Sequence, residues 1–275
     1  MLTTIILSII ALGGMGLLFG FGLAYVARRF AVTEDQKTVD IMNILPGADC
    51  GACGCAGCKA FAREVAAGKR DPGGCVVGGR EVALKLASIL GKEDVDFQPK
   101  VAQLFCGGGR KETSERFSYI GLMTCEAANL VGGGFKSCEY GCLGFGDCVA
   151  ACQFDAIRMD DNGLPVIDRE KCVGCGACVK ACPRGLISLV PAEARVFVRC
   201  RSKAPAREVT KACKVGCIAC RRCERACEYD AIHVEENLAV IDYSKCVACG
   251  ACVKACPRKI IEMVEPKAEE ESKAA

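Results

Sequence analysis

The sequence lacks tryptophan, has one histidine, and has only 6% aromatic residues among its 275 positions. A large hydrophobic core is therefore not expected beyond the first 30 residues, and bound metal should supply much of the folding energy. The G-x-G-x-x-G fingerprint of a dinucleotide site is absent, so the chain itself is not expected to bind NAD. Outside Arg28 and Arg29, 34 basic residues face 33 acidic ones, a balance that gives no indication of nucleic-acid binding.

Cysteine, by contrast, is abundant: the chain has 25. Their number is odd, many fall in tight C-x-x-C runs, and no cleavable signal peptide is evident, so a disulfide scaffold is not indicated. Neighbouring thiolates in such runs can converge on one centre, which is typical of metal sites.

The N-terminal segment of residues 2–27 carries no charge. Roughly 20 residues cross a ~30 Å hydrocarbon core, so this segment predicts a single transmembrane helix. A signal peptide fits less well, because no positive charge precedes the stretch and the stretch is too long. Arg28 and Arg29 follow it, and the positive-inside rule then predicts that the rest of the chain lies in the cytoplasm.

The first cysteine module has the spacing C-x2-C-x4-C-x16-C, formed by Cys50, Cys53, Cys58 and Cys75. Cys55 lies inside the x4 gap and competes as a ligand; we interpret it as a spare thiol. The spacing alone leaves a structural zinc site open. The other cysteine motifs of the chain favour an iron–sulfur cluster at this module as well.

Residues 138–190 and 213–264 form an internal repeat. Each copy has two short apolar stretches, predicted to be strands, followed by the run C-x2-C-x2-C-x3-C-P. Each copy resembles a bacterial two-cluster ferredoxin, in which strands and helices pack around two [4Fe–4S] clusters. In such runs the fourth cysteine binds the other cluster of the pair.

This crossing of ligands predicts three regular sets and one irregular set. The regular sets are Cys217, Cys220, Cys223 and Cys256; Cys246, Cys249, Cys252 and Cys227; and Cys172, Cys175, Cys178 and Cys152. In the remaining set Phe145 stands where the second copy has Cys220, and we expect Cys138 to fill the gap. The irregular set is then Cys138, Cys142, Cys148 and Cys182.

Four further cysteines flank the first copy, two before it and two after it. We expect them to hold a sixth cluster; the alternative is that some are ordinary buried thiols. They are Cys106, Cys125, Cys200 and Cys213. Glu228, which follows Cys227, should lower the potential of a nearby cluster unless it is simply a solvated surface charge. His233 is expected on a strand, as a packing residue rather than a ligand.

The predicted fold class is α+β, made of small iron–sulfur domains behind a membrane helix. Helices are expected at 59–68 and 79–91, and the charged tail should be disordered. The expected boundaries are 1–30 for the anchor, 31–91 for the first module, 92–137 for a linker, 138–199 and 200–265 for the two ferredoxin-like units, and 266–275 for the tail.

The order of these parts is highly specific. With GADCGACGCAGC followed by Cys75, then GCLGFGDC, then the paired C-x2-C-x2-C-x3-C-P runs, the chain resembles the B subunit of the Rnf complexes in its long, cluster-rich form. The first module also resembles the small [4Fe–4S] domain of corrinoid iron–sulfur proteins.

The Rnf resemblance implies an electron-transfer subunit of an ion-translocating ferredoxin:NAD oxidoreductase. It would take electrons from soluble reduced ferredoxin and pass them through [4Fe–4S] clusters toward flavin-bearing and NAD-binding polytopic subunits, which couple the transfer to Na⁺ or H⁺ translocation. No independent catalytic site is expected. Competing interpretations are a zinc-binding interaction module, an anchored donor to a corrinoid protein or another reductase, and a redox sensor.

Overall fold

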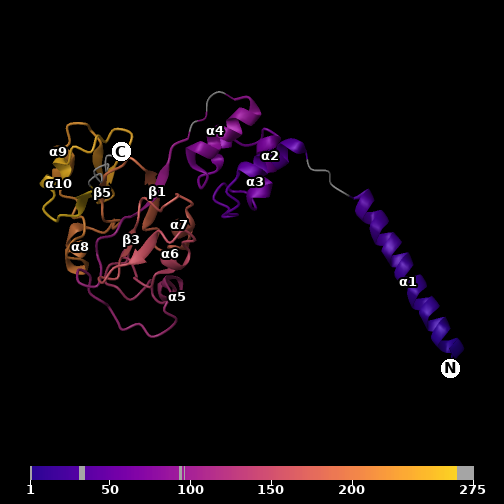
Figure 1. The fold of residues 1–275 in the computed structure, drawn as a ribbon. Helices are drawn as coiled ribbons and strands as arrows, with labels where there is room; N and C mark the ends of the chain where they lie inside the picture. Colours follow the sequence, from indigo (N-terminus) through magenta and orange to yellow (C-terminus); the bar gives the residue numbers. More distant parts are fainter. Residues whose placement is uncertain (1, 31–34, 93–94, 96, 265–275) are drawn as a thin grey trace, which may run out of the picture.

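A computed structural model describes residues 2–30, 35–92, 95 and 97–264; the expected disordered tail lies outside the described residues. The uncharged N-terminal segment forms one helix, α1 (Leu2–Arg29), which projects away from the rest of the molecule (Figure 1). Within the described residues α1 is the one helix long and apolar enough to cross a membrane, with a mean hydropathy of 2.2 and none of that stretch buried. Arg28 and Arg29 lie in its last turn.

The first cysteine module is a small helical unit with its own core. The expected helices are confirmed, and Gly91, with a φ of 67°, ends the last of them in the left-handed region. Ile41, Phe61, Val65 and Leu86 form the fully buried centre of this core. The elements are α2 (Gln36–Ile44), α3 (Cys58–Ala66), the 3₁₀ turn η1 (Pro72–Gly74) and α4 (Gly79–Leu90).

The two ferredoxin-like units share one plan. Each has a central antiparallel hairpin, two short helices that begin in the cysteine runs, and an outer pair of antiparallel strands. In the first unit these are β2 (Ile157–Met159) with β3 (Pro165–Ile167), α6 (Asp147–Ala150), α7 (Ala177–Ala181), and β1 (Lys100–Leu104) with β4 (Ile187–Pro191). In the second they are β6 (Ile232–Glu235) with β7 (Leu238–Ile241), α9 (Arg222–Arg225), α10 (Ala251–Ala255), and β5 (Val196–Val198) with β8 (Ile261–Met263).

The outer strand pairs extend each unit beyond the sequence repeat. Strand β1 comes from the segment expected to be a linker, yet it pairs with β4 of the first unit. Strand β5 falls at the end of the expected first unit, yet it pairs with β8 of the second. Each unit thus begins with a strand that closes against its own last strand; the domain boundaries themselves stay a prediction.

Two further helices lie outside the shared plan: α5 (Cys125–Leu130) before the first unit's hairpin and α8 (Ala206–Ala212) before that of the second. A shared apolar cluster joins the two units. Phe105 and Phe197, which belong to this cluster, meet edge-on with ring centroids 6.5 Å apart. The hydrophobic core of each unit is built around its cysteines, so the thiols are packed into the interior.

Candidate metal centres

In the first module, Cys50 and Cys53 lie in the loop before α3, Cys58 begins that helix, and Cys75 follows η1. Asp49 Oδ1 accepts a 2.6 Å hydrogen bond from the backbone N–H of Cys58, which fixes the start of the helix beside that loop. Burial, followed by the neighbouring thiols of Cys58, Cys53 and Cys50, raises the pKa of Cys75. The expected quartet is therefore gathered in one place.

Cys55 is set apart from this quartet by a partner of its own. Its side chain is 8% exposed, and its Sγ lies 3.4 Å from Oε2 of Glu64. Burial and then that hydrogen bond raise the pKa of Cys55 to about 11. Arg70 holds the same Glu64 oxygen at 2.5 Å and donates to the carbonyl of Cys53. This network agrees with the interpretation of Cys55 as a spare thiol, although its role stays a prediction.

In the second ferredoxin-like unit, the thiols gather in the two expected sets. Burial and then the neighbouring thiols of the same set raise the pKa of Cys223 and of Cys252 to about 11. Each set lines its own hollow. One hollow is lined by Cys217, Cys220, Cys223 and Cys256, and the other by Cys227, Cys246, Cys249 and Cys252.

In the first unit, the regular set is also together. Burial and then the thiols of Cys172, Cys175 and Cys152 raise the pKa of Cys178 to about 11. The backbone N–H of Ala102, on β1, donates to the sulfur of Cys172 at 3.3 Å.

The irregular set differs from the expectation. The structure brings Cys125, and not Cys138, next to the other three thiols of this set. Burial and then the thiols of Cys125 and Cys182 raise the pKa of Cys148 to about 12. One hollow is lined by Cys125, Cys142, Cys148 and Cys182.

The carboxylate of Asp147 explains this exchange. It accepts hydrogen bonds from the backbone N–H groups of Cys125 at 2.8 Å and Glu126 at 3.1 Å, at the start of α5. Thr124 caps the same helix by accepting from Ala127 N–H. The sequence segment that precedes the repeat is thereby pinned over the first unit, with Cys125 turned into the gap.

The remaining four thiols lie between the two units and line a further hollow: Cys106, Cys138, Cys200 and Cys213. Each unit supplies two of them from equivalent places. Cys106 and Cys200 follow the opening strands β1 and β5, and Cys138 aligns with Cys213 in the repeat. The alignment of Cys138 with Cys213 in the repeat could have predicted this grouping, because equivalent residues in two copies are expected to take equivalent roles.

Hydrogen bonds tie this bridging group to both units in the same way. The N–H of Cys142 donates to the sulfur of Cys106 at 3.5 Å, and the N–H of Cys217, its counterpart, donates to the sulfur of Cys200 at 3.4 Å. A residue of one thiol group therefore touches a sulfur of the next.

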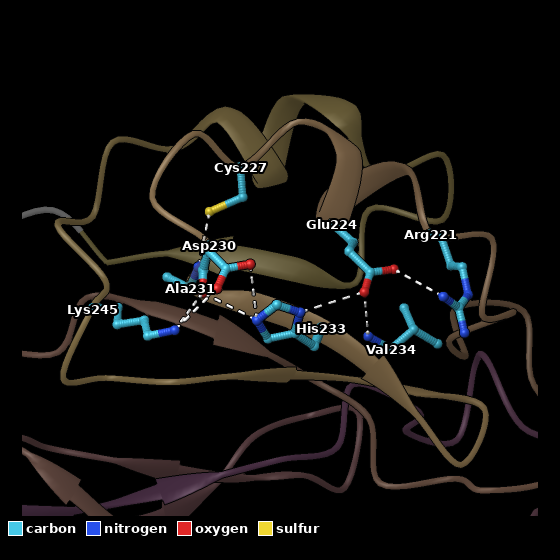
Figure 2. A network of polar contacts seen from close by, with 8 residues as sticks. All are labelled: Arg221, Glu224, Cys227, Asp230, Ala231, His233, Val234 and Lys245. Carbon is cyan, nitrogen blue, oxygen red and sulfur yellow. Dashed lines mark hydrogen bonds and ion pairs between the residues drawn. The ribbon is translucent and has the colours of Figure 1, made fainter.

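The thiol groups fit a cofactor larger than a single ion. Among the described residues no three cysteine, histidine or acidic side chains converge closely enough to hold one metal ion, whereas four of the quartets surround a hollow. Backbone N–H groups aim at the sulfurs, as that of Ala231 does at Cys227 (3.4 Å; Figure 2). Such donors stabilise negative charge on a cluster and tune its potential.

A buried cation supports the same conclusion. Lys136 is 2% exposed, and its Nζ lies 3.4 Å from the carbonyl of Gly108; within the described part of the chain it forms no ion pair with a carboxylate. Burial raises the pKa of Cys142 to about 12, and the Lys136 ammonium acts in the opposite direction. A buried charge needs a partner of opposite sign, and an anionic thiolate-ligated cluster supplies one. Bound iron would displace the thiol protons that burial otherwise retains.

His233 lies in a polar network rather than in the core. Figure 2 shows its ring between two carboxylates: Nδ1 lies 3.5 Å from Glu224 and Nε2 lies 3.3 Å from Asp230. Lys245 pairs with Asp230 at 3.0 Å. The expected strand is confirmed, but the side chain is 40% exposed and is not a packing residue.

Three family models match parts of the chain. They are described as a putative Fe-S cluster (residues 45–77), a 4Fe-4S binding domain (165–188) and a 4Fe-4S dicluster domain (216–260). The chain is therefore made of iron–sulfur and ferredoxin-like 4Fe-4S domains, as the sequence predicted.

Curated relatives match nearly the whole chain. It is 43% identical to the B subunit of the Na(+)-translocating ferredoxin:NAD(+) oxidoreductase complex of Acetobacterium woodii, over 89% of this chain and 74% of that protein. It is 44% identical to the counterpart from the proton-translocating complex of Clostridium ljungdahlii, over 88% of this chain and 86% of that one. It is 40% identical to the B subunit of the ion-translocating oxidoreductase complex of Methanosarcina acetivorans, over 96% of this chain and all of that protein.

Proposed function

Because this chain belongs to the B-subunit family of the Rnf ion-translocating oxidoreductase complexes, we propose that it accepts electrons from reduced ferredoxin and relays them through six [4Fe–4S] clusters. Its 4Fe-4S domains give it an electron-transfer role, and its family gives it other Rnf subunits as partners. The relay would end at partner subunits that carry flavin and NAD and that couple the transfer to Na⁺ or H⁺ translocation. This chain contributes thiolate ligands, backbone donors to sulfur and a buried cation.

The observation that carries this proposal is a series of neighbouring thiol groups that runs from the Cys217 group of the second unit, through the bridging group, to both groups of the first unit. In the second unit, Cys217 touches the bridging group through its N–H bond to Cys200. The bridging group in turn touches the first unit through Cys106 and Cys142. There the thiols of Cys148 and Cys178 are near enough to influence each other's charge. The proposed order is second unit, bridging group, first unit.

The ligand sets follow from these groupings. The first module would hold one cluster, each ferredoxin-like unit two, and the bridging group the sixth. The set between the units is Cys106, Cys138, Cys200 and Cys213. The set of the first unit that includes Cys125, whose backbone Asp147 holds in place, is Cys125, Cys142, Cys148 and Cys182.

The family and the apolar helix α1 indicate membrane association. The finer proposal is a single-pass anchor with the iron–sulfur domains on the cytoplasmic side, supported by Arg28 and Arg29 at the C-terminal end of α1. Labelling of a single introduced surface cysteine is impractical in a chain with 25 thiols, so protease access in sealed vesicles of known orientation is the suitable test.

The experiment for the relay is anaerobic isolation of the full chain followed by iron analysis and reduction. Six clusters of four irons give about 24 iron atoms per chain and equal acid-labile sulfide. Reduced ferredoxin should bleach the brown absorbance of the protein. A colourless, zinc-containing preparation, or one that only a chemical reductant bleaches, would contradict the proposal.

A further inference from the structure

Three arginines lie on or next to the short helix α9, immediately above the thiol group of Cys217, Cys220, Cys223 and Cys256. Arg221 lines the hollow of that group, and its side chain is 63% exposed. Arg222 and Arg225 are exposed as well. We refer to Arg221, Arg222 and Arg225 as the arginine patch.

The backbone at Arg221 is strained. Its φ is 57°, in the left-handed region that is unfavourable for a residue with a Cβ. The aligned residue of the first unit is Gly146, with a φ of 84°, which meets no such penalty. The backbone geometry at this position therefore does not itself favour arginine over glycine.

The acidic residue within the arginine patch does not cancel its outward charge. Glu224 is half-buried, and its carboxylate points back to β6, where Oε1 faces His233 and the N–H of Val234 (Figure 2). Its pairing with Arg221 is loose, at 3.6 Å. Arg222 is not engaged in any ion pair among the described residues, and Arg225 reaches only the carbonyl of Cys220, at 3.5 Å.

The first unit has no counterpart to the arginine patch. The residues aligned with its three arginines are Gly146, Asp147 and Ala150. There the segment that carries Cys125, which Asp147 holds in place, lies beside the equivalent thiol group. Of the two short helices α6 and α9, only α9 places three exposed arginines at its thiol group.

We propose that the arginine patch is the docking surface for a small acidic electron carrier, which delivers its electrons to the cluster beneath α9. Guanidinium groups bind carboxylates in a directional, bidentate way, and a positive surface steers a negative partner into productive encounters. The inference rests on the proposed function, for which it names the place where electrons enter. The group below the patch is also the one that touches the bridging group, so entry here leads directly into the relay.

The test compares the full-length protein with the double variant R222E/R225E, both purified anaerobically in detergent. Stopped-flow absorbance follows reduction by a small acidic two-cluster ferredoxin. At low salt we expect the second-order rate constant of the variant to fall at least about 10-fold. At about 1 M salt, where screening leaves a Debye length of about 3 Å, the two proteins should react at similar rates.

A matched control carries the same change of net charge elsewhere. R158E/K171E reverses two exposed basic residues of the first unit and should react like the unaltered protein. Iron content and the extent of reduction by dithionite should be the same in all three proteins. Equal low-salt rates for R222E/R225E and the unaltered protein would overturn the docking surface, as would an equal loss in R158E/K171E. Failure of the unaltered protein to accept electrons from ferredoxin would instead overturn the proposed function.

Discussion

The two ferredoxin-like units are copies of one sequence repeat, and the turn before their first short helix is where their residues differ most in chemistry. Both have the run that ends in ACVKACP, both begin the short helix inside that run after a left-handed glycine, and both close an outer strand pair. Where the second unit has Cys220, Arg221 and Arg222, the first has Phe145, Gly146 and Asp147. The difference decides how each cluster site meets its surroundings.

In the first unit, the replacement of a thiol by Phe145 is compensated from a distance. Asp147 binds the start of α5, which brings Cys125 into the gap. In the second unit, the local run supplies all three neighbouring thiols, and the helix beside them carries arginines. The comparison teaches that an internal repeat can keep its thiol groups while the two copies differ in where the thiols come from and in the charge beside them.

The largest expected effect tests which cysteines share a cluster. If Cys125 and Cys142 hold the same one, the double variant C125S/C142S should lose about four iron atoms, the same loss as either single variant. The sets expected from the sequence alone would instead give a loss of about eight. Iron and acid-labile sulfide per chain decide between them, with Cys55→Ser, which should lose none, as the control.

The corresponding pair at the bridging group is C106S/C138S. By the same reasoning it should also lose about four iron atoms. A loss of about eight would separate Cys138 from Cys106 and restore Cys138 to the first unit.

The next effect concerns Asp147, which holds the start of α5 against the first unit. Asp147→Ala removes the acceptor for two backbone N–H groups and should destabilise the start of α5 by about 1–2 kcal/mol. Amide hydrogen exchange at Cys125 and Glu126 should accelerate about 10-fold or more, because 1.4 kcal/mol corresponds to a factor of ten. Arg222→Ala, at the aligned position of the second unit, should leave exchange in α9 unchanged; equal effects of the two substitutions would contradict the distinct role of Asp147.

A smaller, electrostatic effect distinguishes Lys136 from its aligned counterpart Lys211. Lys136 is buried beside the thiols of Cys106 and Cys142, whereas Lys211 is exposed. Lys136→Met removes a positive charge near anionic clusters and should lower at least one midpoint potential by tens of millivolts, since 59 mV is a factor of ten for one electron. Lys211→Met should shift none, because solvent screens its charge. A redox titration monitored by EPR that shows no difference would contradict the pairing of Lys136 with a cluster.

The smallest expected effect concerns the segment that leads into α5 and carries Cys125. Ile120 is 94% exposed there, so Ile120→Ser should change stability by no more than about 0.5 kcal/mol. Heating curves followed by cluster absorbance should superimpose on those of the unaltered protein. A large drop would mean that this apolar side chain, and not Asp147, holds the segment.

Much of the fold was predictable because it depends on short-range pattern. The strands around His233 and the helix ending at Gly91 follow from local apolar periodicity and from a residue that tolerates a left-handed backbone. The thiol sets of the second unit follow likewise from the spacing of one run. The contact of His233 with Glu224 was not predictable, because Glu224 reaches it from α9, whereas Asp230 lies only three residues before it.

The grouping of Cys125 and Cys138 is the point at which the structure departs from the expected sets. Proximity along the chain favoured Cys138 as the substitute for Cys220, since it lies nearer to Cys142. The repeat itself argued otherwise, because the aligned Cys213 had no place in its own unit. Symmetry between the copies was the better guide here than distance in sequence.

By itself the sequence predicted the long apolar helix, the iron–sulfur nature of the domains and the thiols that each tight run brings together, because a few residues of covalent chain limit how far neighbouring thiols can separate. The tertiary structure decided the two groups of thiols that draw on distant cysteines. Strand pairing places Cys106 and Cys200 at equivalent edges of the two units, and the carboxylate of Asp147 fixes Cys125. A long connection leaves its ends free to meet in many ways, so only packing and specific hydrogen bonds select one.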